Sequence, residues 1–405
     1  MLYKMKRSRV ILALIASLFC LKVGFEGKIR QLCTKKGKKK MNATEKISGN
    51  QLGFLIFTFV VSTLILSVPG VMVAFAKQDA WMSVFPASIT GIISIGVMTT
   101  LANRYPGLTI MEYSTKITGK WLGKIFGFYF SYYLFFFISS TVNEHAVFIR
   151  TVLLPRTPSF VGIVTILILA GLAVFSGIEV IGRCNEFLLP IIIALLIPLF
   201  ILSIGDADPG QLKPVLGEGI MPVLKGAVVP SAWMSQFFFM GWLLPYLNQP
   251  QKARKVSFIA LLCMIVLIVI IDLVAIMVFG PISGRLNFSF LRVVEYIGLV
   301  GSLERMEALA VSVWIMGIFV KVSVLLYMFC LSVSQMFNIK NYRAIVSPVT
   351  LLSIIGSVWI FKSAAEFQAW ITLTYPVLAF FTQSLLPLSL LIIDTLRRSM
   401  DNSLS

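Results

Sequence analysis

Ten long apolar stretches constrain the fold of this chain more than any other feature of its sequence. A helix needs about 20 residues to cross the hydrocarbon core of a bilayer, and each stretch approaches or exceeds that length. Helices of soluble proteins carry a polar face, whereas these stretches are apolar on all sides. The sequence therefore predicts an all-α integral membrane protein with about ten transmembrane helices. The stretches lie near residues 51–76, 83–103, 125–149, 159–180, 186–204, 227–247, 256–280, 306–335, 345–361 and 367–394.

The amino-acid composition supports this class of protein. Hydrophobic residues make up 58% of the 405 residues and charged residues only 13%, whereas a soluble domain carries about 25% charged residues. The five cysteines have neither the spacing of a disulfide framework nor that of a zinc site. No catalytic or metal-binding constellation stands out in the sequence. We therefore expect a protein that is not an enzyme and that uses no cofactor and no metal.

Positive charge is concentrated before the first apolar stretch. Residues 1–46 hold thirteen lysines and arginines against two glutamates, and basic charge beside a first span is retained in the cytoplasm. Because the number of spans is even, both termini are then predicted to be cytoplasmic. The run KKGKKK would also suit a nucleic acid, but no folded basic domain accompanies it, so we expect no nucleic-acid partner.

The sequence divides into three parts. We expect residues 1–46 to be a basic cytoplasmic extension without a fold of its own, and Met41, which opens a polar lead-in to the first span, to be the natural start. Residues 47–398 form the predicted transmembrane, transporter-like domain, which contacts membrane lipid. Residues 399–405 form a predicted cytoplasmic tail.

The first and the sixth predicted spans are interrupted by helix-breaking residues. The first holds Pro69 and Gly70, and the sixth holds Pro230 and Pro245. In hydrocarbon, an interrupted helix persists only where protein or a wet cavity satisfies its free backbone groups. The first and sixth spans correspond if ten helices form two repeats of five, and matched breaks of this kind mark the binding site of a transporter. The alternative is a pair of ordinary proline kinks.

A lysine lies deep inside the eighth span. Lys321 is more than ten residues from either end of its apolar stretch, too far for its ammonium group to reach the headgroups. It is either a fixed or titrating cation that faces a cavity at an ion or coupling site, or a lysine that holds exposed carbonyls of a broken helix. Both interpretations place it inward. Asp272 in the seventh span is a candidate partner.

Hydroxyl and aromatic side chains supply further candidates for ligand contact. Ser323 and Tyr327 are four residues apart and share one helix face, where they offer hydroxyls to a ligand or to neighbouring helices. The third span contains YFSYYLFFFISS, whose aromatic side chains are expected to wall a pocket unless they simply pack. Tyr129, Tyr132 or Tyr133 would supply a polar tip, and Tyr132 and Phe136 are taken as the predicted ligand contacts. Glu144 and His145 are expected to form a solvated pair at the outer end of that span.

Six segments of the chain form a recognisable series: DAW (79–81), NRYPGLTIMEYSTKITGKWLGKIFG (103–127), LLPRTP (153–158), GIEVIGRCNEFLLP (177–190), LKPVLGEGIMPVLKGA (212–227) and LLPYLNQPQKARK (243–255). In this order they resemble segments of the spore germination protein family, the B subunits of GerA-type nutrient receptors. This family belongs to the amino acid–polyamine–organocation superfamily, whose fold is two inverted five-helix repeats. The resemblance covers residues 41–398 and implies that fold.

The resemblance also implies a function. Such B subunits lie in the inner membrane of dormant spores, act with an A subunit and a C lipoprotein, bind a small-molecule germinant that is often an amino acid, and start germination. We therefore expect a membrane ligand-sensing subunit of a germinant receptor. A proton- or cation-coupled amino acid permease is the main alternative, and a pore that conducts ions when germinant binds is another.

The expected site lies at mid-membrane between the broken first and sixth helices, against the third and eighth. Relatives usually carry Gly-Thr-Gly-Ile in the first span, where this chain has Ser62 to Ile65, so the bulk of Leu64 favours a smaller or less polar ligand. Backbone groups near Ser62–Ile65 and Val229–Ser231 are expected to orient the ligand. The predicted binding residues are Ser62, Thr63, Leu64, Ile65, Tyr132, Phe136, Val229, Pro230, Ser231, Ser323 and Tyr327, with Lys321 at the ion or coupling site.

Overall fold

The computed structural model describes residues 45–286, 288–300 and 307–404, and these residues form a helical unit. The predicted extension, with Met41, falls almost wholly outside the described residues. The principal helices are α2 (Gly49–Ser67), α3 (Pro69–Ala76), α4 (Val84–Arg104), α5 (Ile110–Thr118), α6 (Lys120–Val152), α7 (Ser159–Ser176), α8 (Ile178–Ser203), α9 (Met221–Gly226), α10 (Val228–Met234), α11 (Met240–Leu243), α12 (Ala253–Phe279), α13 (Ser289–Val300), α14 (Glu307–Met336), α15 (Val346–Trp359), α16 (Ala364–Ala369), α17 (Tyr375–Ala379) and α18 (Leu386–Leu404).

Nine helical stretches of the described residues are long and apolar enough to cross a membrane. The predicted span at 227–247 is not among them, because it is divided into short helices rather than one long helix. The prediction of about ten spans, with the first and sixth broken, is therefore confirmed.

The first span is broken at a proline. Helix α2 ends at Ser67, and α3 begins at Pro69 after a single residue, Val68. Pro69 has no N–H, so the carbonyl four residues earlier loses its helical donor. Gly70 follows because the chain is crowded here: a Cβ atom at this position would lie 2.7 Å from the Ser289 hydroxyl oxygen.

The sixth span is a series of short helical pieces. Ala227 separates α9 from α10, and a 3₁₀ segment, Ser235–Phe239, joins α10 to α11. Pro230 lies in the first turn of α10, where a missing N–H costs little. A second 3₁₀ segment, Leu244–Tyr246, ends the span. Changes of helix type inside a span often mark functional sites, because they redirect side chains and free backbone groups.

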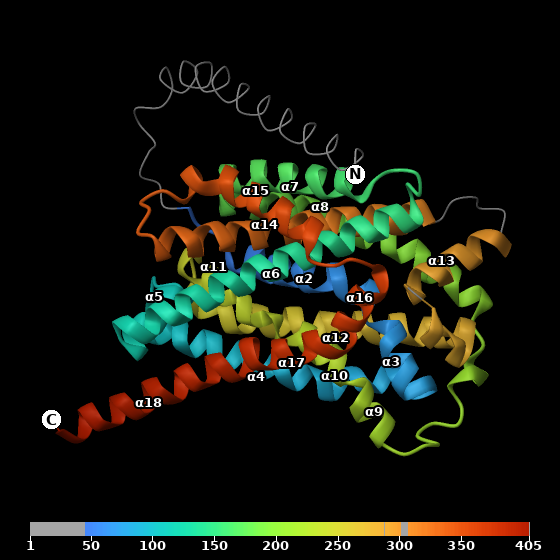
Figure 1. The fold of residues 1–405 in the computed structure, drawn as a ribbon. Coiled ribbons are helices and arrows are strands. Elements are labelled where there is room, and N and C mark those ends of the chain that lie inside the picture. The colour runs from blue at the N-terminus through green and yellow to red at the C-terminus, as the bar shows by residue number, and fades with distance from the viewer. Residues whose placement is uncertain (1–44, 287, 301–306, 405) are drawn as a thin grey trace. The chain divides into compact units, whose positions relative to one another are not determined.

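Helix α2 occupies the interior of the described unit. It packs against α12, α14, α8 and α13, while α6 packs against α14, α15 and α7 (Figure 1). A capping box at Ser48 and Gln51 fixes the start of α2, and the Gln51 amide also donates to Glu186 of α8 at 2.9 Å. The two broken spans meet where α10 contacts α2 and α3.

The tenth span contains two π-helical segments. The first, Trp370–Thr374, lies between α16 and α17, and the second, Phe380–Leu385, lies between α17 and α18. Helix α18 then continues to Leu404, so the predicted tail at 399–405 begins inside a helix. The sequence offers no glycine or proline after Pro387 that would end it earlier.

Candidate functional site

A polar cavity lies where the first, third, sixth, eighth and tenth spans meet. The centre of a water molecule can occupy a volume of about 10 Å³ inside this cavity. This is room for about one water molecule. Its walls combine one lysine, one glutamate, an amide, hydroxyls and aromatic rings. The lining residues are Thr63, Phe137, Ser140, Thr141, Glu144, Trp233, Gln236, Lys321, Trp370, Ile371 and Tyr375.

Lys321 points into this cavity with its side chain 1% exposed. Its ammonium group donates to Thr63 Oγ1 at 2.6 Å and to Gln236 Oε1 at 3.1 Å. The ammonium nitrogen also lies 4.9 Å and 5.5 Å from the ring centres of Phe59 and Phe137, within the range of cation–π attraction. The lysine therefore faces inward as predicted, and side chains rather than backbone carbonyls receive its hydrogen bonds.

The suggested pairing of Lys321 with Asp272 is wrong. Asp272 is fully buried in α12, and neither of its carboxylate oxygens has a hydrogen-bond partner among the described residues. The sequence showed that both residues lie at membrane depth, but it could not show that they lie on helix faces that do not meet.

Thr63 joins three spans through one hydroxyl group. Its Oγ1 accepts hydrogen bonds from Lys321 of α14 and from the indole N–H of Trp233 of α10, the latter at 2.9 Å. A hydroxyl oxygen has two lone pairs, so these two donors use its accepting capacity. This residue therefore fixes the side chains that line the cavity from the first, sixth and eighth spans.

The tenth span contributes to the site through residues that the sequence analysis did not identify. The Gln236 amide donates to the Tyr375 hydroxyl at 2.8 Å, and the Ser235 hydroxyl donates to Gln383 Oε1 at 2.7 Å. The Gln383 amide in turn donates to the Tyr133 hydroxyl at 2.5 Å. Gln383 lies in the second π-helical segment. Polar residues inside an apolar stretch, Tyr375 and Gln383, were the available signals.

Glu144 is buried at the break of the first span, with 5% of its side chain exposed. Its carboxylate accepts a hydrogen bond from Ser67, the last residue of α2. Glu144 and Lys321 line the same cavity, yet no ion pair joins them in the part of the chain that the structure describes. The predicted solvated pair with His145 is wrong, because both residues are buried. Helix α6 extends to Val152, so Glu144 lies well inside it.

The aromatic face of α6 differs from the prediction by one position. Tyr132 is 56% exposed and points away from the cavity, whereas Tyr133 is 2% exposed. Phe136 is half-buried against Trp370, with ring centres 5.5 Å apart, and Phe137 lines the cavity instead. Residues four apart share a helix face, so an error of one residue displaces both members of the predicted pair.

The expected backbone donors of the first span are engaged elsewhere. Ser62 to Ile65 lie within the continuous helix α2, upstream of the break at Val68. Leu64 is fully buried and does not line the polar cavity, while Ser62 and Ile65 line a separate, apolar pocket of the molecule. Of this segment only Thr63 faces the polar cavity.

The remaining predicted residues lie outside the polar cavity. Val229 and Pro230 are buried in α10, and the Ser231 hydroxyl donates to the Val228 carbonyl at 2.6 Å. Ser323 is fully buried on α14. Tyr327 packs edge-on against Tyr246 and Tyr342, with ring centres 5.8 Å and 5.2 Å away.

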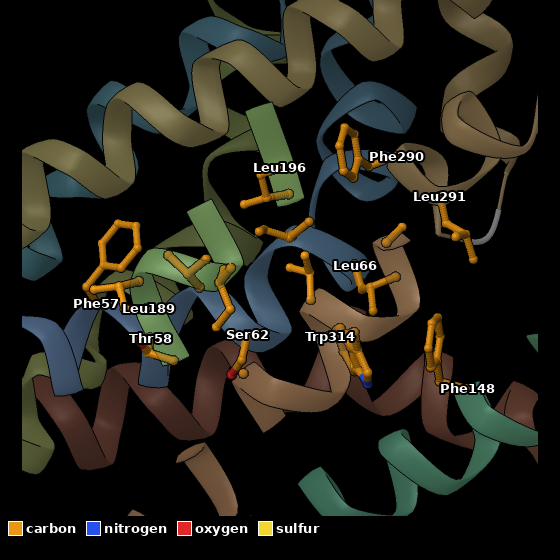
Figure 2. A pocket seen from close by; sticks show the side chains of 16 residues that line it. Phe57, Thr58, Ser62, Leu66, Phe148, Leu189, Leu196, Phe290, Leu291 and Trp314 are labelled. Carbon is orange, nitrogen blue, oxygen red and sulfur yellow. The ribbon is translucent and has the colours of Figure 1, made fainter. Parts of the chain in front are cut away.

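A second pocket is apolar. Figure 2 shows side chains of α2, α8, α13 and α14 converging on it, with Phe148 of α6 at one edge. About 50 Å³ of it is open to the centre of a water-sized sphere. It shares no lining residue with the polar cavity.

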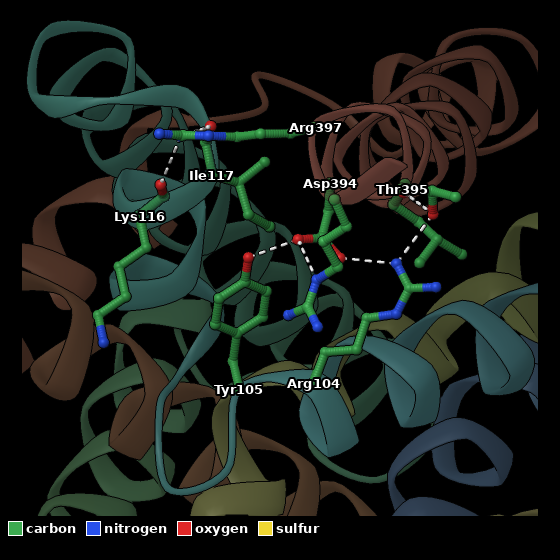
Figure 3. A network of polar contacts seen from close by, with 9 residues as sticks. Arg104, Tyr105, Lys116, Ile117, Asp394, Thr395 and Arg397 are labelled. Atoms are coloured by element: carbon green, nitrogen blue, oxygen red, sulfur yellow. Dashed lines mark hydrogen bonds and ion pairs between the residues drawn. The ribbon is translucent and has the colours of Figure 1, made fainter. Parts of the chain in front are cut away.

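A polar network joins the end of α4 to the middle of α18 (Figure 3). Asp394 accepts from Arg104 at 2.6 Å, from the Tyr105 hydroxyl at 2.5 Å and from Arg398 at 3.1 Å. Arg397 extends the network to the carbonyls of Lys116 and Ile117 in α5, at 3.5 Å and 3.4 Å. Partial burial and the hydrogen bond to Asp394 raise the pKa of Tyr105, which keeps its hydroxyl a donor.

Solved structures share the fold of this chain. One is Mhp1, a nucleobase-cation-symport-1 family transporter in a closed conformation with bromovinylhydantoin bound, with a TM-score of 0.62 and 14% identity; the match covers 84% of this chain and 78% of that one. Another is MhsT in complex with L-phenylalanine, with a TM-score of 0.58 and 15% identity, covering 84% and 89%. These likenesses support the predicted transporter-type helical fold.

Proteins of similar sequence indicate the family of this chain. Spore germination protein YndE of Bacillus subtilis (strain 168) is 29% identical over 304 residues, which cover 73% of this chain and 83% of the relative. Spore germination protein KB of the same organism is 26% identical over 327 residues, covering 79% and 87%. The family model described as "Spore germination protein" matches residues 46–365. This multi-pass membrane protein therefore belongs to the spore germination protein family.

Proposed function

We propose that the chain is the membrane ligand-sensing subunit of a spore germinant receptor, which binds a small nutrient in the polar cavity and triggers germination. One observation carries the proposal: a buried lysine and a buried glutamate line a single cavity where the broken first and sixth helices meet. Ionisable side chains at membrane depth are costly and mark binding sites or ion pathways.

The charges of the cavity suit a zwitterionic nutrient such as an amino acid. Its carboxylate would take hydrogen bonds from Lys321, and its amino group would donate to Glu144, both of them charge-assisted contacts. Trp233, Trp370 and Tyr375 form the wall against which an apolar side chain would pack.

The size of the cavity implies a conformational change. Room for about one water molecule does not admit an amino acid, so the nutrient binds an arrangement of the helices in which the cavity is wider. Binding then shifts the population towards that arrangement, whereas a nutrient with equal affinity for both arrangements would shift nothing. In the proposed receptor, an A subunit and a C lipoprotein read this shift in the inner membrane of the spore, with both termini of this chain cytoplasmic.

A proton- or cation-coupled amino acid permease is the second candidate function. The fold shared with transporters and the two ionisable groups in one cavity favour it. Vesicles that contain the purified protein distinguish the candidates. Uptake of a labelled amino acid that stops when the ion gradient is collapsed supports the permease, and its absence in a protein that still supports nutrient germination supports the sensor.

Substitution of Lys321 tests the proposed sensor in spores. Lys321→Met removes the charge but keeps an unbranched side chain, and we expect a rise of at least tenfold in the nutrient concentration that gives half-maximal germination. Lys340→Met makes the same change at an exposed loop position and should leave the dose–response unchanged. A normal response in Lys321→Met spores that contain wild-type protein levels would overturn the proposal, and the protein level must be measured because lost folding would mimic lost sensing.

A further inference from the structure

The apolar pocket is built from five helices that are distant in sequence. Phe57 to Leu66 of α2 form one wall, Leu189 to Leu196 of α8 face it, and α6, α13 and α14 close the remaining sides (Figure 2). Nearly all lining side chains are buried, so the pocket is a space inside the helical packing rather than a groove between lipid-facing side chains.

The lining chemistry determines what the pocket can hold. Its walls are mainly side chains of leucine, isoleucine, valine, phenylalanine and tryptophan. The Ser62 hydroxyl donates to the Phe59 carbonyl at 3.1 Å. The Thr58 hydroxyl and the Trp314 indole N–H also belong to the lining side chains; both are buried in the wall and have no hydrogen-bond partner among the described residues. A water molecule needs two to four polar partners, so an apolar cavity of this kind stays dry and takes up apolar molecules instead. An empty space also costs stability, because the atoms around it lack contact partners.

The pocket lies directly beside the polar cavity, across α2 and α14. On α2, Ser62 lines the apolar pocket and Thr63 lines the polar cavity. On α14, Gly317 lines the apolar pocket and Lys321 lines the polar cavity. The two helices touch closely at this point, since a Cβ atom at Gly317 would lie 3.0 Å from Ser62 Cβ. A molecule in the apolar pocket therefore contacts both helices that hold the Lys321–Thr63 hydrogen bond.

We propose that this pocket, lined by α2, α6, α8, α13 and α14, is a second binding site, and that it takes a small uncharged apolar molecule such as a short alkyl chain. The site is separate from the germinant site proposed above and does not depend on it. Its ligand is held by dispersion contacts and by removal of apolar surface from water or lipid, without hydrogen bonds.

Trp314 provides a direct probe, because its ring lines the pocket. The experiment uses the full chain in lipid nanodiscs and titrates 1-bromopropane, whose bromine quenches tryptophan fluorescence at contact. The quenching of Trp314 is obtained by subtracting the quenching measured for Trp314→Phe from that measured for the wild-type protein. This subtraction removes the contribution of lipid-facing tryptophans. We expect a saturable quenching of Trp314. A linear response without saturation, as for simple partition into lipid, would overturn the proposal.

Filling the pocket supplies a matched test. Ala310→Leu adds bulk to a lining residue, whereas Ala308→Leu makes the same change two residues away at an exposed position of α14. We expect Ala310→Leu to abolish the saturable quenching and Ala308→Leu to retain it. Leu196→Phe fills the pocket from α8 and provides the same test if Ala310→Leu does not fold. Quenching that survives in a folded, filled variant contradicts the proposed site.

The outcome is independent of the germinant proposal. Lys321→Met changes the polar cavity and leaves the lining of the apolar pocket intact, so it should quench like the wild-type protein even if germination is lost. Loss of saturable quenching in Ala310→Leu together with a normal germination response in Lys321→Met would support this inference and reject the germinant site.

Discussion

The ammonium group of Lys321 lies 2.6 Å from the hydroxyl oxygen of Thr63, and this hydrogen bond connects the eighth span to the first one turn before its break. The same hydroxyl accepts from Trp233 of the sixth span. The Thr63 side chain therefore connects the first, sixth and eighth spans through hydrogen bonds.

Removing the Thr63 hydroxyl should destabilise the protein. Thr63→Val keeps the shape of the side chain but leaves the Trp233 indole N–H without its acceptor and Lys321 with one fewer, and each unsatisfied buried group costs about 1–3 kcal/mol. We expect a lower midpoint of thermal unfolding in detergent or nanodiscs. Thr63→Ser retains the hydroxyl and should restore most of the loss; equal destabilisation by both substitutions would show that the methyl group matters rather than the hydrogen bonds.

Glu144 should control the response to the nutrient. If the amino group of the nutrient binds this carboxylate, Glu144→Gln removes a charge-assisted contact and should raise the half-maximal nutrient concentration at least tenfold, which corresponds to about 1.4 kcal/mol. Ser67→Ala, which removes only the donor to Glu144, should have a smaller effect. Glu179→Gln, at an exposed position of α8, is the control for loss of a carboxylate. An unchanged dose–response for Glu144→Gln would exclude this role.

Two adjacent tyrosines of α6 offer a matched comparison. Tyr133→Phe removes the acceptor of the Gln383 amide and should cost about 0.5–1.5 kcal/mol, more if the amide stays unsatisfied. Tyr132→Phe changes an exposed residue and should stay within about 0.5 kcal/mol of the wild-type protein. Thermal unfolding of the two variants measures the difference. Equal effects would mean that the inward face of α6 has been assigned to the wrong tyrosine.

The network between the end of α4 and the middle of α18 should respond to loss of the Asp394 charge. Asp394→Asn keeps the size of the side chain but weakens its hydrogen bonds to Arg104, Tyr105 and Arg398, on the order of 1 kcal/mol for each bond lost. The loss should be larger at low salt than at high salt, because Arg398 is exposed and screened by ions. Asp206→Asn, at an exposed position, is the control. Unfolding midpoints that do not differ between the two variants would mean that the network adds nothing to stability.

Composition and helix-breaking residues predicted most of the fold. Apolar stretches are long enough to read directly as spans, and Pro69 marks the first break because a proline cannot donate to the preceding turn. The inward position of Lys321 followed from the cost of exposing an ammonium group to lipid. These predictions depend on local properties of the chain.

The details of the site depend on helix phase and on contacts between distant segments, which the sequence alone does not specify. Tyr132 was chosen over Tyr133 because an all-apolar span gives no polar face from which to set the phase. Glu144 was placed at an interface because the end of α6 was predicted too early. Tyr375 and Gln383 were missed because π-helical segments change the register of the tenth span.

Those π-helical segments give the tenth span a mechanical property. A hydrogen bond in a π turn spans one residue more than a hydrogen bond in an α turn. Each π-helical segment therefore contains one residue more than the α-helix needs there. Release of that residue into α geometry would rotate everything beyond it by about 100°, the angle per residue of an α-helix. Gln383 lies within the second segment, and Asp394 follows eleven residues later in α18, so such a rotation would turn Asp394 while the residues before Phe380 stay in place. Release in the second segment would therefore turn the Asp394 carboxylate away from Arg104, its partner at 2.6 Å.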